Sequence, residues 1–511
     1  QLPIIFLVQD NEWGISVTKE EARTSDAYDY AAGFVGLNRM RIDGTDFVES
    51  FIQMQKAVHF VREERKPLLV CAKTVLIGHH TSGVRREFYR DKADLAKHRA
   101  KDPGIILKKY LLEEGFSEET LSQIETEARK QIEEDFNKAI LAPDPKPESV
   151  KEHVYAPTPI TEEKGNRVPE NGEKIPMVDA GIHAIQELMH KHPEALLYGQ
   201  DVGGRIGGVF REAVTLQQKF GNKRVFNTAI QEAYIIGSTV GMSAVGLKPI
   251  VEVQFADYIY PGINQLVTEV SKSCYLSNGK YPVSSIIRVP IGAYGGGGPY
   301  HSGSVETMLA QIKGIKIAYP SNAADFKGLF KAAFYDPNPV IFLEHKGLYW
   351  SKVPGTEDAK TVEPAEDYIL PFGKANIVKF ANEEEVQKGR TLVVVTYGMG
   401  VYWAKEAAKN FEGRIEIIDL RTIKPIDEEL VFERVKIHGK CILLTEEALN
   451  NSMMEAFGAR ISKNCFKHLD AAVEIMGSLD LPAVPINLIL EKEMLPNAEK
   501  LSLRINELLQ N

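Results

Sequence analysis

Short apolar runs separated by helical segments recur along the chain, and this alternation constrains the fold more than any other feature of the sequence. In the middle of the chain such runs lie at residues 195–198, 224–226, 249–255, 286–289, 315–318 and 340–344. A strand buried on both faces reads as a continuous apolar run, and the helices between such runs are the crossovers that parallel strands need. The sequence therefore predicts an α/β fold with parallel sheets covered by helices on both faces.

A proline-rich, polar stretch interrupts this alternation. Seven of the 26 prolines fall between Pro143 and Pro176, a composition typical of a linker. The flanking patterns predict strands at 2–8, 67–75, 391–396, 415–419 and 441–445, and helices at about 45–65, 103–113 and 117–139. We therefore expect an α/β part over residues 1–142, a linker over 143–176, a second α/β part over 177–365 and a smaller α/β domain over 366–511.

Length and composition exclude several classes of protein. A chain of 511 residues exceeds what one hydrophobic core supports. Its 61 Lys and Arg residues against 70 Asp and Glu residues leave no basic excess for a nucleic-acid partner. No apolar run approaches the roughly 20 residues of a membrane span. Four scattered cysteines without a CxxC motif indicate neither a disulfide framework nor a zinc or iron–sulfur site, and they favour the cytoplasm.

Polar loops follow two predicted strands of the first part, and open α/β sheets bind ligands at such strand ends. Asn11 and the main-chain carbonyl of Trp13 could coordinate Mg²⁺ that carries a diphosphate, although Asp and Asn also favour plain turns. His80, in the loop 77–83, could transfer protons near neutral pH or could be an exposed histidine. Because the first apolar run follows Gln1 directly, we expect a further βα unit upstream.

Two motifs with similar alternatives lie in the second part. Glu232 enters a helix with a small, apolar interior, where the pKa of a carboxyl group is adjustable and suits hydrogen bonding to a heterocycle nitrogen. The alternative is a first-turn glutamate that complements the helix dipole. His301 ends the glycine-rich loop 292–303, which is either a second acid–base site close to a ligand or a flexible surface loop.

A dinucleotide-binding interpretation of residues 391–419 fails at one position. Gly398 and Gly400 follow a strand, and Asp419 ends the next one, as in a dinucleotide fingerprint. The third glycine position is Trp403, which is far too large for close packing of helix on strand. An NAD-dependent dehydrogenase is therefore a weaker alternative.

Together these motifs resemble the E1 components of the thiamine diphosphate-dependent 2-oxoacid dehydrogenases, with the α and β subunits fused. Residues 1–155 are similar to the C-terminal part of an α subunit, and residues 177–511 to a complete β subunit. The segments 77–80, 225–228, 254–259 and 419–423 follow the branched-chain type. The resemblance implies a thiamine diphosphate-binding fold with a transketolase-like C-terminal domain. It also implies oxidative decarboxylation of a 2-oxo acid and reductive acylation of lipoyl-lysine on an acyltransferase, E2. A pyruvate-specific E1 is the alternative.

The resemblance also implies roles for individual residues and an assembly. The implied residues are Glu232, His301 and His80 for catalysis; Tyr258, Glu232, Gln254, Asn11 and Trp13 for the cofactor; Asn11 and Trp13 for Mg²⁺; and Asp336 and Asn338 for a monovalent cation such as K⁺. Because these residues come from α-like and β-like parts, the resemblance implies a homodimer.

The chain also departs from the family pattern. The acidic-glycine motif that supplies another Mg²⁺ ligand is expected upstream of Gln1, and two arginines that commonly hold the diphosphate are Gln9 and Leu76 here. The phosphorylation loop of the family is replaced by residues 81–85, which argues against control by a kinase. These departures leave a catalytically inactive scaffold as a further alternative.

Overall fold

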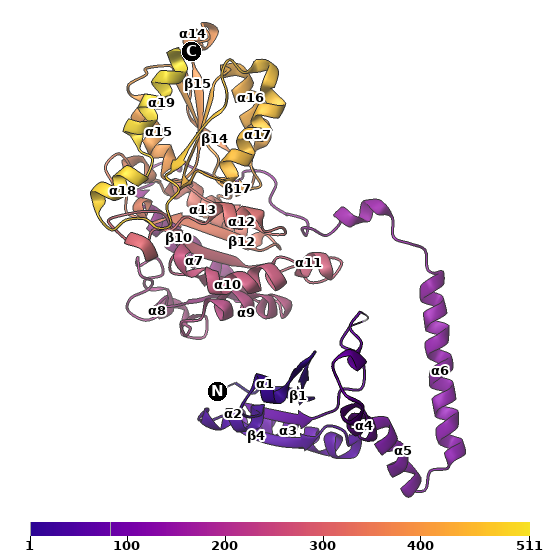
Figure 1. Cartoon of the computed structure of the whole chain (residues 1–511). Coiled ribbons are helices and arrows are strands. Elements are labelled where there is room, and N and C mark those ends of the chain that lie inside the picture. Colours follow the sequence, from indigo (N-terminus) through magenta and orange to yellow (C-terminus); the bar gives the residue numbers. More distant parts are fainter. Residues whose placement is uncertain (1, 82, 511) are drawn as a thin grey trace. The chain divides into compact units, whose positions relative to one another are not determined.

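A computed structural model of the chain describes residues 2–81 and 83–510, which form two compact units, Gln1–Pro145 and Lys146–Asn511 (Figure 1). The expectations that concern Gln1 and Ser82 lie outside the described residues. Among the described residues, every helix is too short or too polar to cross a lipid bilayer.

The first unit is built on a parallel sheet with the strand order β1-β5-β4. These strands are β1 (Ile5–Asp10), β5 (Leu68–Lys73) and β4 (Asn38–Asp43), and helix α3 (Phe47–Glu64) packs on the sheet through Ala57 and Val61. Further elements are β2 (Trp13–Gly14), β3 (Val17–Thr18), α1 (Lys19–Ala22), α2 (Ala27–Tyr30), α4 (Lys92–Ala100), α5 (Pro103–Glu113) and α6 (Glu118–Leu141). The predicted strands and helices of this part are thus confirmed, and β4 is an addition.

The second unit contains a seven-stranded sheet with the order β17-β11-β12-β10-β9-β7-β8, in which all pairs except β11–β17 are parallel. Its strands are β7 (Ala195–Gly199), β8 (Val225–Asn227), β9 (Lys248–Glu252), β10 (Ile286–Ile291), β11 (Lys316–Ala318), β12 (Val340–His345) and β17 (Thr422–Lys424). Its helices are α7 (Met177–Lys191), α8 (Leu216–Phe220), α9 (Glu232–Ala244), α10 (Tyr260–Gln265), α11 (Ser273–Leu276), α12 (Glu306–Gln311) and α13 (Ala323–Tyr335).

Neighbouring residues of these strands point into opposite cores. Ile286 packs with α7 and α13 in one hydrophobic cluster, whereas Ile287 packs with α9 and α12 in another. Because side chains alternate between the faces of a strand, this division places helices on both faces of the sheet. The predicted α/β fold with covered parallel sheets is confirmed.

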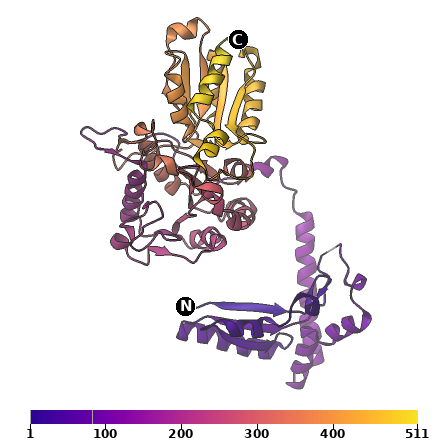
Figure 2. The same ribbon diagram turned by 60° about the vertical axis from the view of Figure 1, so that its left-hand side comes forward.

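A five-stranded sheet with the order β14-β16-β15-β18-β19 forms the rest of the second unit. Helices α15 and α19 cover one face, and α16 and α17 cover the other (Figures 1 and 2). The elements are β14 (Asn376–Lys379), α14 (Glu383–Gln387), β15 (Leu392–Thr396), α15 (Gly400–Ala408), β16 (Ile415–Asp419), α16 (Glu428–His438), β18 (Cys441–Ala448), α17 (Met453–Cys465), β19 (Glu474–Ser478), α18 (Leu488–Met494) and α19 (Ala498–Gln510).

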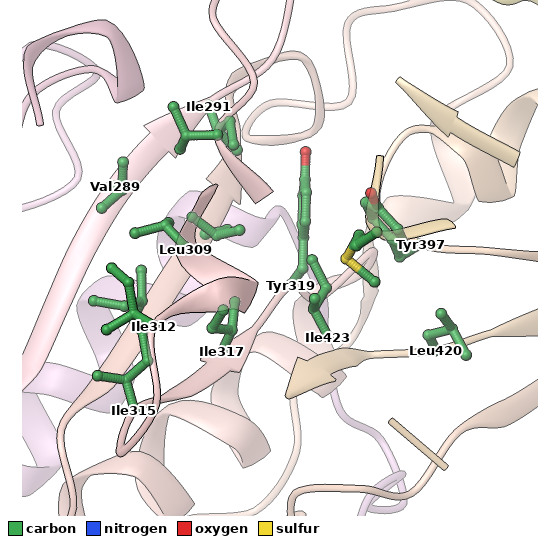
Figure 3. Packing of buried hydrophobic residues seen from close by; sticks show 14 of the residues in the cluster. Val289, Ile291, Leu309, Ile312, Ile315, Ile317, Tyr319, Tyr397, Leu420 and Ile423 are labelled. Carbon is green, nitrogen blue, oxygen red and sulfur yellow. The ribbon is translucent and has the colours of Figure 1, made fainter. Parts of the chain in front are cut away.

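The two sheets of the second unit share one core cluster, although the sequence predicts two domains there. Strand β17 leaves the C-terminal part and pairs antiparallel with β11 of the larger sheet. Nearby, the rings of Tyr319 and Tyr397 lie 5.1 Å apart, and Leu309 and Ile423 belong to the same cluster (Figure 3). The unit therefore owes its compactness to apolar side chains from both parts.

Much of the proline-rich stretch is attached to the second unit. The hydroxyl of Tyr155 donates to the carbonyl of Ile315, and Arg167 binds Asp325. Strand β6 (Lys174–Ile175) pairs antiparallel with β13 (Thr361–Val362). The stretch expected as a linker over 143–176 is therefore fixed from about Val150 onward, because the Val150 carbonyl accepts from the hydroxyl of Tyr275 and later aromatic and charged side chains find partners in the unit.

Replacing Phe326 by alanine should lower the free energy of unfolding of the second unit by about 3–5 kcal/mol, the usual loss for a buried aromatic ring. The Phe326 ring is fully buried and lies 4.9 Å from the Phe342 ring. Urea denaturation measures the change. Phe380→Ala, at a ring that is 65% exposed, is the control and should change the value by less than about 0.5 kcal/mol. Equal effects would contradict the core assignment.

Candidate functional site

The carboxyl ends of four neighbouring strands of the seven-stranded sheet carry the polar residues that the sequence singles out. Gln200 follows β7, Glu232 follows β8, and Gln254 and Tyr258 follow β9. The loop after β10 ends at His301. Since β8, β7, β9 and β10 are adjacent and parallel, these residues share one edge of the sheet.

Glu232 is a buried carboxylate at the start of α9. Its residue is 8% exposed, and its Oε1 accepts a hydrogen bond from Nε2 of Gln200 at 2.8 Å. Ile235 and Ile236, one turn later, bury the helix against the sheet. The carboxylate is therefore held at the sheet edge by both the helix and Gln200, where it can bind a nitrogen-containing ring.

Tyr258 and His301 form a hydrogen-bonded pair at the same edge. The Tyr258 hydroxyl lies 2.9 Å from Nε2 of His301, and the Phe255 ring packs edge-on against the imidazole at 4.7 Å. Burial and the nearby charges of Asp257 and Glu232 raise the pKa of Tyr258. The pair can exchange a proton, and the negative charge of Glu232 favours the neutral form of the Tyr258 hydroxyl.

Gln254 acts on the turn after β7. Its Nε2 donates to Oδ2 of Asp201 at 2.7 Å and lies 3.5 Å from the carbonyl oxygen of Gln200. Asp201 has a positive φ of 58°, a conformation that non-glycine residues adopt rarely. Gln254 thus supports the segment that presents Gln200 to the catalytic candidate Glu232.

The main chain of the loop with His301 is bound at both ends by side chains from outside the loop. The Lys346 ammonium donates to the carbonyl of His301, and burial lowers the pKa of Lys346 to about 8. The amide of Ala293 donates to Oε1 of Glu446 at 2.5 Å, and Oε2 of Glu446 lies 2.8 Å from Nε2 of His345. The loop position is therefore fixed without using the imidazole of His301.

Sequence reasoning misses three supporting residues of this site. Gln200 directly follows β7, and Lys346 directly follows β12. A polar residue directly after an apolar run is a sequence signal that could find both. Glu446 contacts a residue 153 positions earlier in the sequence, so a local pattern gives no signal for it.

In the first unit, Asn11 and Trp13 form a turn at the carboxyl end of β1. Oδ1 of Asn11 accepts from the amide of Trp13 at 3.0 Å. The neighbouring Asp10 is buried between Arg23 and Lys73, which neutralise its charge. The oxygens that could hold Mg²⁺ here are the Asn11 side chain and the Trp13 carbonyl. Both are neutral, so they suit a cation that brings its own anionic oxygens, as a metal diphosphate does.

His80 and His79 differ in what they contact. Nδ1 of His79 accepts from the amide of Arg86 at 3.1 Å and thereby closes the loop. His80 is exposed in the loop that follows β5. His79 is structural, whereas His80 is available to a reacting group.

Asp336 and Asn338 lie at the amino edge of the larger sheet, the opposite edge from Glu232. Oδ2 of Asp336 accepts from the Lys316 ammonium. Oδ1 of Asp336 accepts from the main-chain amide and from Nδ2 of Asn338. The amide group of Asn338 binds both main-chain groups of Ala156. A monovalent cation here would need main-chain carbonyls as ligands, because the side-chain oxygens already accept from protein donors.

The structure thus divides the predicted residues into three sets. Glu232, Gln254, Tyr258 and His301 share the carboxyl edge of the larger sheet in the second unit, and Asp336 and Asn338 lie at its amino edge. Asn11, Trp13 and His80 follow strands of the first unit.

Three family models match consecutive parts of the chain. The dehydrogenase E1 component model matches residues 1–148, the transketolase pyrimidine-binding domain matches 173–351, and the transketolase C-terminal domain matches 382–501. A solved structure, the inactive β4 tetramer of a split-gene transketolase, covers 66% of this chain and 99% of its own. Its TM-score is 0.50 at 19% identity, which shows the fold alone.

Curated relatives specify the family further. The 2-oxoisovalerate dehydrogenase subunit beta of Bacillus subtilis is 37% identical over 334 residues, which are 65% of this chain and 97% of the relative. That of Pseudomonas aeruginosa is 38% identical over 320 residues, 60% of this chain and 87% of the relative. The pyruvate dehydrogenase E1 component subunit beta of Acholeplasma laidlawii is 38% identical over 301 residues, 58% of this chain and 87% of the relative.

The relatives and the dehydrogenase E1 model both indicate 2-oxoacid dehydrogenases. None of the three family models is of a nicotinamide-dependent enzyme. The chain therefore belongs to the E1 components of the thiamine diphosphate-dependent 2-oxoacid dehydrogenases, with an α-type and a β-type part fused in one chain, and by sequence to their branched-chain type.

Proposed function

We propose that this E1 component oxidatively decarboxylates a branched-chain 2-oxo acid and transfers the acyl group to lipoyl-lysine of an E2 acyltransferase. One observation carries the proposal. The buried carboxylate of Glu232 lies at the carboxyl edge of the sheet together with the Tyr258–His301 pair, in a chain of this family. An aminopyrimidine ring needs such a carboxylate, and acyl transfer needs an acid–base pair nearby.

Each unit, taken by itself, carries residues suited to one part of thiamine diphosphate with Mg²⁺. In the second unit Glu232 would bind the pyrimidine ring and Tyr258 would line it, and in the first unit Asn11 with the Trp13 carbonyl would hold the metal ion. When bound, the cofactor supplies the nucleophilic carbon and the electron sink for decarboxylation.

The side chains of the chain itself then control protons and water. Gln200 binds Oε1 of Glu232, so Oε2 is the oxygen that can hold or release a proton at the pyrimidine ring. Nε2 of His301 exchanges a proton with the Tyr258 hydroxyl or with the substrate. The Phe255 ring covers the imidazole and keeps water away from that side.

The exposed loop with His80 suits reaction with a partner protein. A lipoyl-lysine arm is long and carried by E2, so the residue that meets it must be reachable from solvent, as His80 is. A homodimer, a K⁺ ion at Asp336 and Asn338, and a cytoplasmic location stay predictions.

Pyruvate is the second candidate substrate. The observation in its favour is the 38% identity to a pyruvate dehydrogenase E1 subunit beta, which equals the identity to a 2-oxoisovalerate dehydrogenase subunit. The ratio of kcat/KM values for 2-oxoisovalerate and pyruvate decides between the two.

Glu232→Gln should still bind thiamine diphosphate but should lose at least about 100-fold in decarboxylation, because the change keeps size and removes the ionisable group. Hydrogen–deuterium exchange at cofactor C2 is the direct measurement, with 2-oxoisovalerate turnover beside it. Glu269→Gln, at an exposed glutamate, is the matched control and should behave as wild type. C2 exchange at the wild-type rate in Glu232→Gln would contradict the role.

His80→Ala should impair transfer to a lipoyl domain more than it impairs decarboxylation with an artificial electron acceptor. The difference should be about 100-fold or more, the lower end of the range for one acid–base group. Both assays are run on one preparation, with the exposed His59→Ala on α3 as control. Equal losses in the two assays would assign His80 to the cofactor step.

Lys346→Met should loosen the loop that carries His301, because the main-chain carbonyl of His301 loses its buried cationic donor. Amide hydrogen exchange in residues 293–303 should become about tenfold faster. Lys352→Met, at an exposed lysine, should leave exchange there unchanged. Wild-type protection in Lys346→Met would contradict this role and would show that other contacts of the loop, such as Ala293 with Glu446 and Gly303 with Asp257, are enough to order it.

A further inference from the structure

The loop that carries His80 is held at its start through the main chain of Leu76. Strand β5 ends at Lys73, and the amide of Leu76 donates to Nδ1 of His98 at 3.0 Å. The carbonyl oxygen of Leu76 accepts from Nη1 of Arg90 at 2.7 Å. Side chains at or just before α4 therefore bind both main-chain polar groups of one residue.

Asp94 joins the two side chains that bind Leu76. Its Oδ2 accepts from Nε of Arg90 at 2.6 Å, and its Oδ1 lies 3.4 Å from Nε2 of His98. Asp94 and His98 are four residues apart on α4 and so share one face of the helix. The side chains of Arg90 and His98 are 0% and 4% exposed, so water does not readily replace a lost partner.

These contacts require one protonation state of His98. Because Nδ1 accepts an N–H, it carries no proton, and the imidazole proton lies on Nε2 and faces Asp94. Burial and the charges of Arg90 and Lys97 lower the pKa of His98, whereas Asp94 and Glu12 act in the opposite direction. The ring is thus kept neutral and able to accept.

Arg90 connects this arrangement to the turn after β1. Its guanidinium lies 5.1 Å from the centre of the Trp13 ring, a cation–π contact. At the far end of the loop, His79 accepts from the amide of Arg86. The loop is therefore bound at its start and its end, while the side chain of His80 is exposed.

We propose that His98 is a positioning residue that, with Asp94 and Arg90, clamps Leu76 and thereby presents His80 to the incoming lipoyl group. The identity of that group rests on the proposed function, whereas the clamp rests on hydrogen bonds within the first unit. His98 acts through the main chain and touches no reacting atom.

Limited digestion with trypsin tests the clamp without cofactor or activity. Two trypsin sites directly follow the loop, namely Arg85, whose side chain is 64% exposed, and Arg86. His98→Leu removes the acceptor at similar size, whereas His98→Asn keeps an acceptor oxygen near the place of Nδ1. Cleavage after Arg85 or Arg86 should become about tenfold faster in His98→Leu and change less than about threefold in His98→Asn. Cleavage after the exposed Lys388 in the second unit is the internal reference.

Two activity assays on the same variants test the positioning role. In His98→Leu, transfer to a lipoyl domain should fall about tenfold while reduction of an artificial acceptor stays within about twofold. His98→Asn should restore most of the transfer. Asp94→Asn keeps volume and weakens the link to Arg90, so it should show the same pattern and replaces His98→Leu if that variant does not fold.

Wild-type cleavage rates in His98→Leu, or equal acceleration in His98→Leu and His98→Asn, would overturn the clamp. Faster cleavage with equal losses in both activity assays would overturn the positioning role. If the wild-type enzyme shows no transfer with any 2-oxo acid, the proposed function fails, and the digestion still decides the clamp.

Discussion

Burial of the seven-stranded sheet on both faces is the constraint on which the site depends. Ile286 and Ile287 are neighbours in β10, and both are fully buried, in opposite clusters. Strands in this position have little room for polar side chains along their length, so groups that must meet a ligand lie at their ends. Glu232, Tyr258 and His301 all occupy such ends, which is why residues distant in sequence share one edge.

Arg288 of β10 is a buried charged exception within the sheet, together with Glu252 of β9 and Glu344 of β12, and it fixes the strands beneath the site. Its Nε and Nη2 bind Glu344 at 2.7 and 2.9 Å, and its Nη1 lies 3.0 Å from Glu252. Burial and the adjacent Glu212 raise the pKa of Glu252, so the carboxylates do not all carry charge beside one guanidinium. Loss of one partner would leave buried charge uncompensated, which ties β9, β10 and β12 together just below the edge.

Local patterns are sufficient to predict most of the strands and the polar loops at their ends, because continuous apolar runs mark burial on both faces. They miss the edge strands β4, β14, β17 and β19. Glu232 can be predicted from the sequence for a similar reason, because it begins a helix with an apolar interior. Contacts between residues that are distant in sequence produce no such local pattern. The antiparallel pairing of β17 with β11, the bond from Lys346 to the loop of His301, and the pairing of Asp336 with Lys316 arise from tertiary packing. Periodicity therefore predicts which residues lie at the edge, but it does not predict what holds them there.

The two loops that carry candidate histidines are ordered in the same way. Side chains outside each loop bind its main chain, at Leu76 in one loop and at the carbonyl of His301 in the other. An imidazole that served as the anchor would be committed to one protonation state, as His98 is, and could not exchange protons with a substrate. Binding the main chain separates the order of the loop from the reactivity of its histidine. The anchoring residues consequently lie outside the motifs by which the chain resembles its family, and their importance follows from the structure.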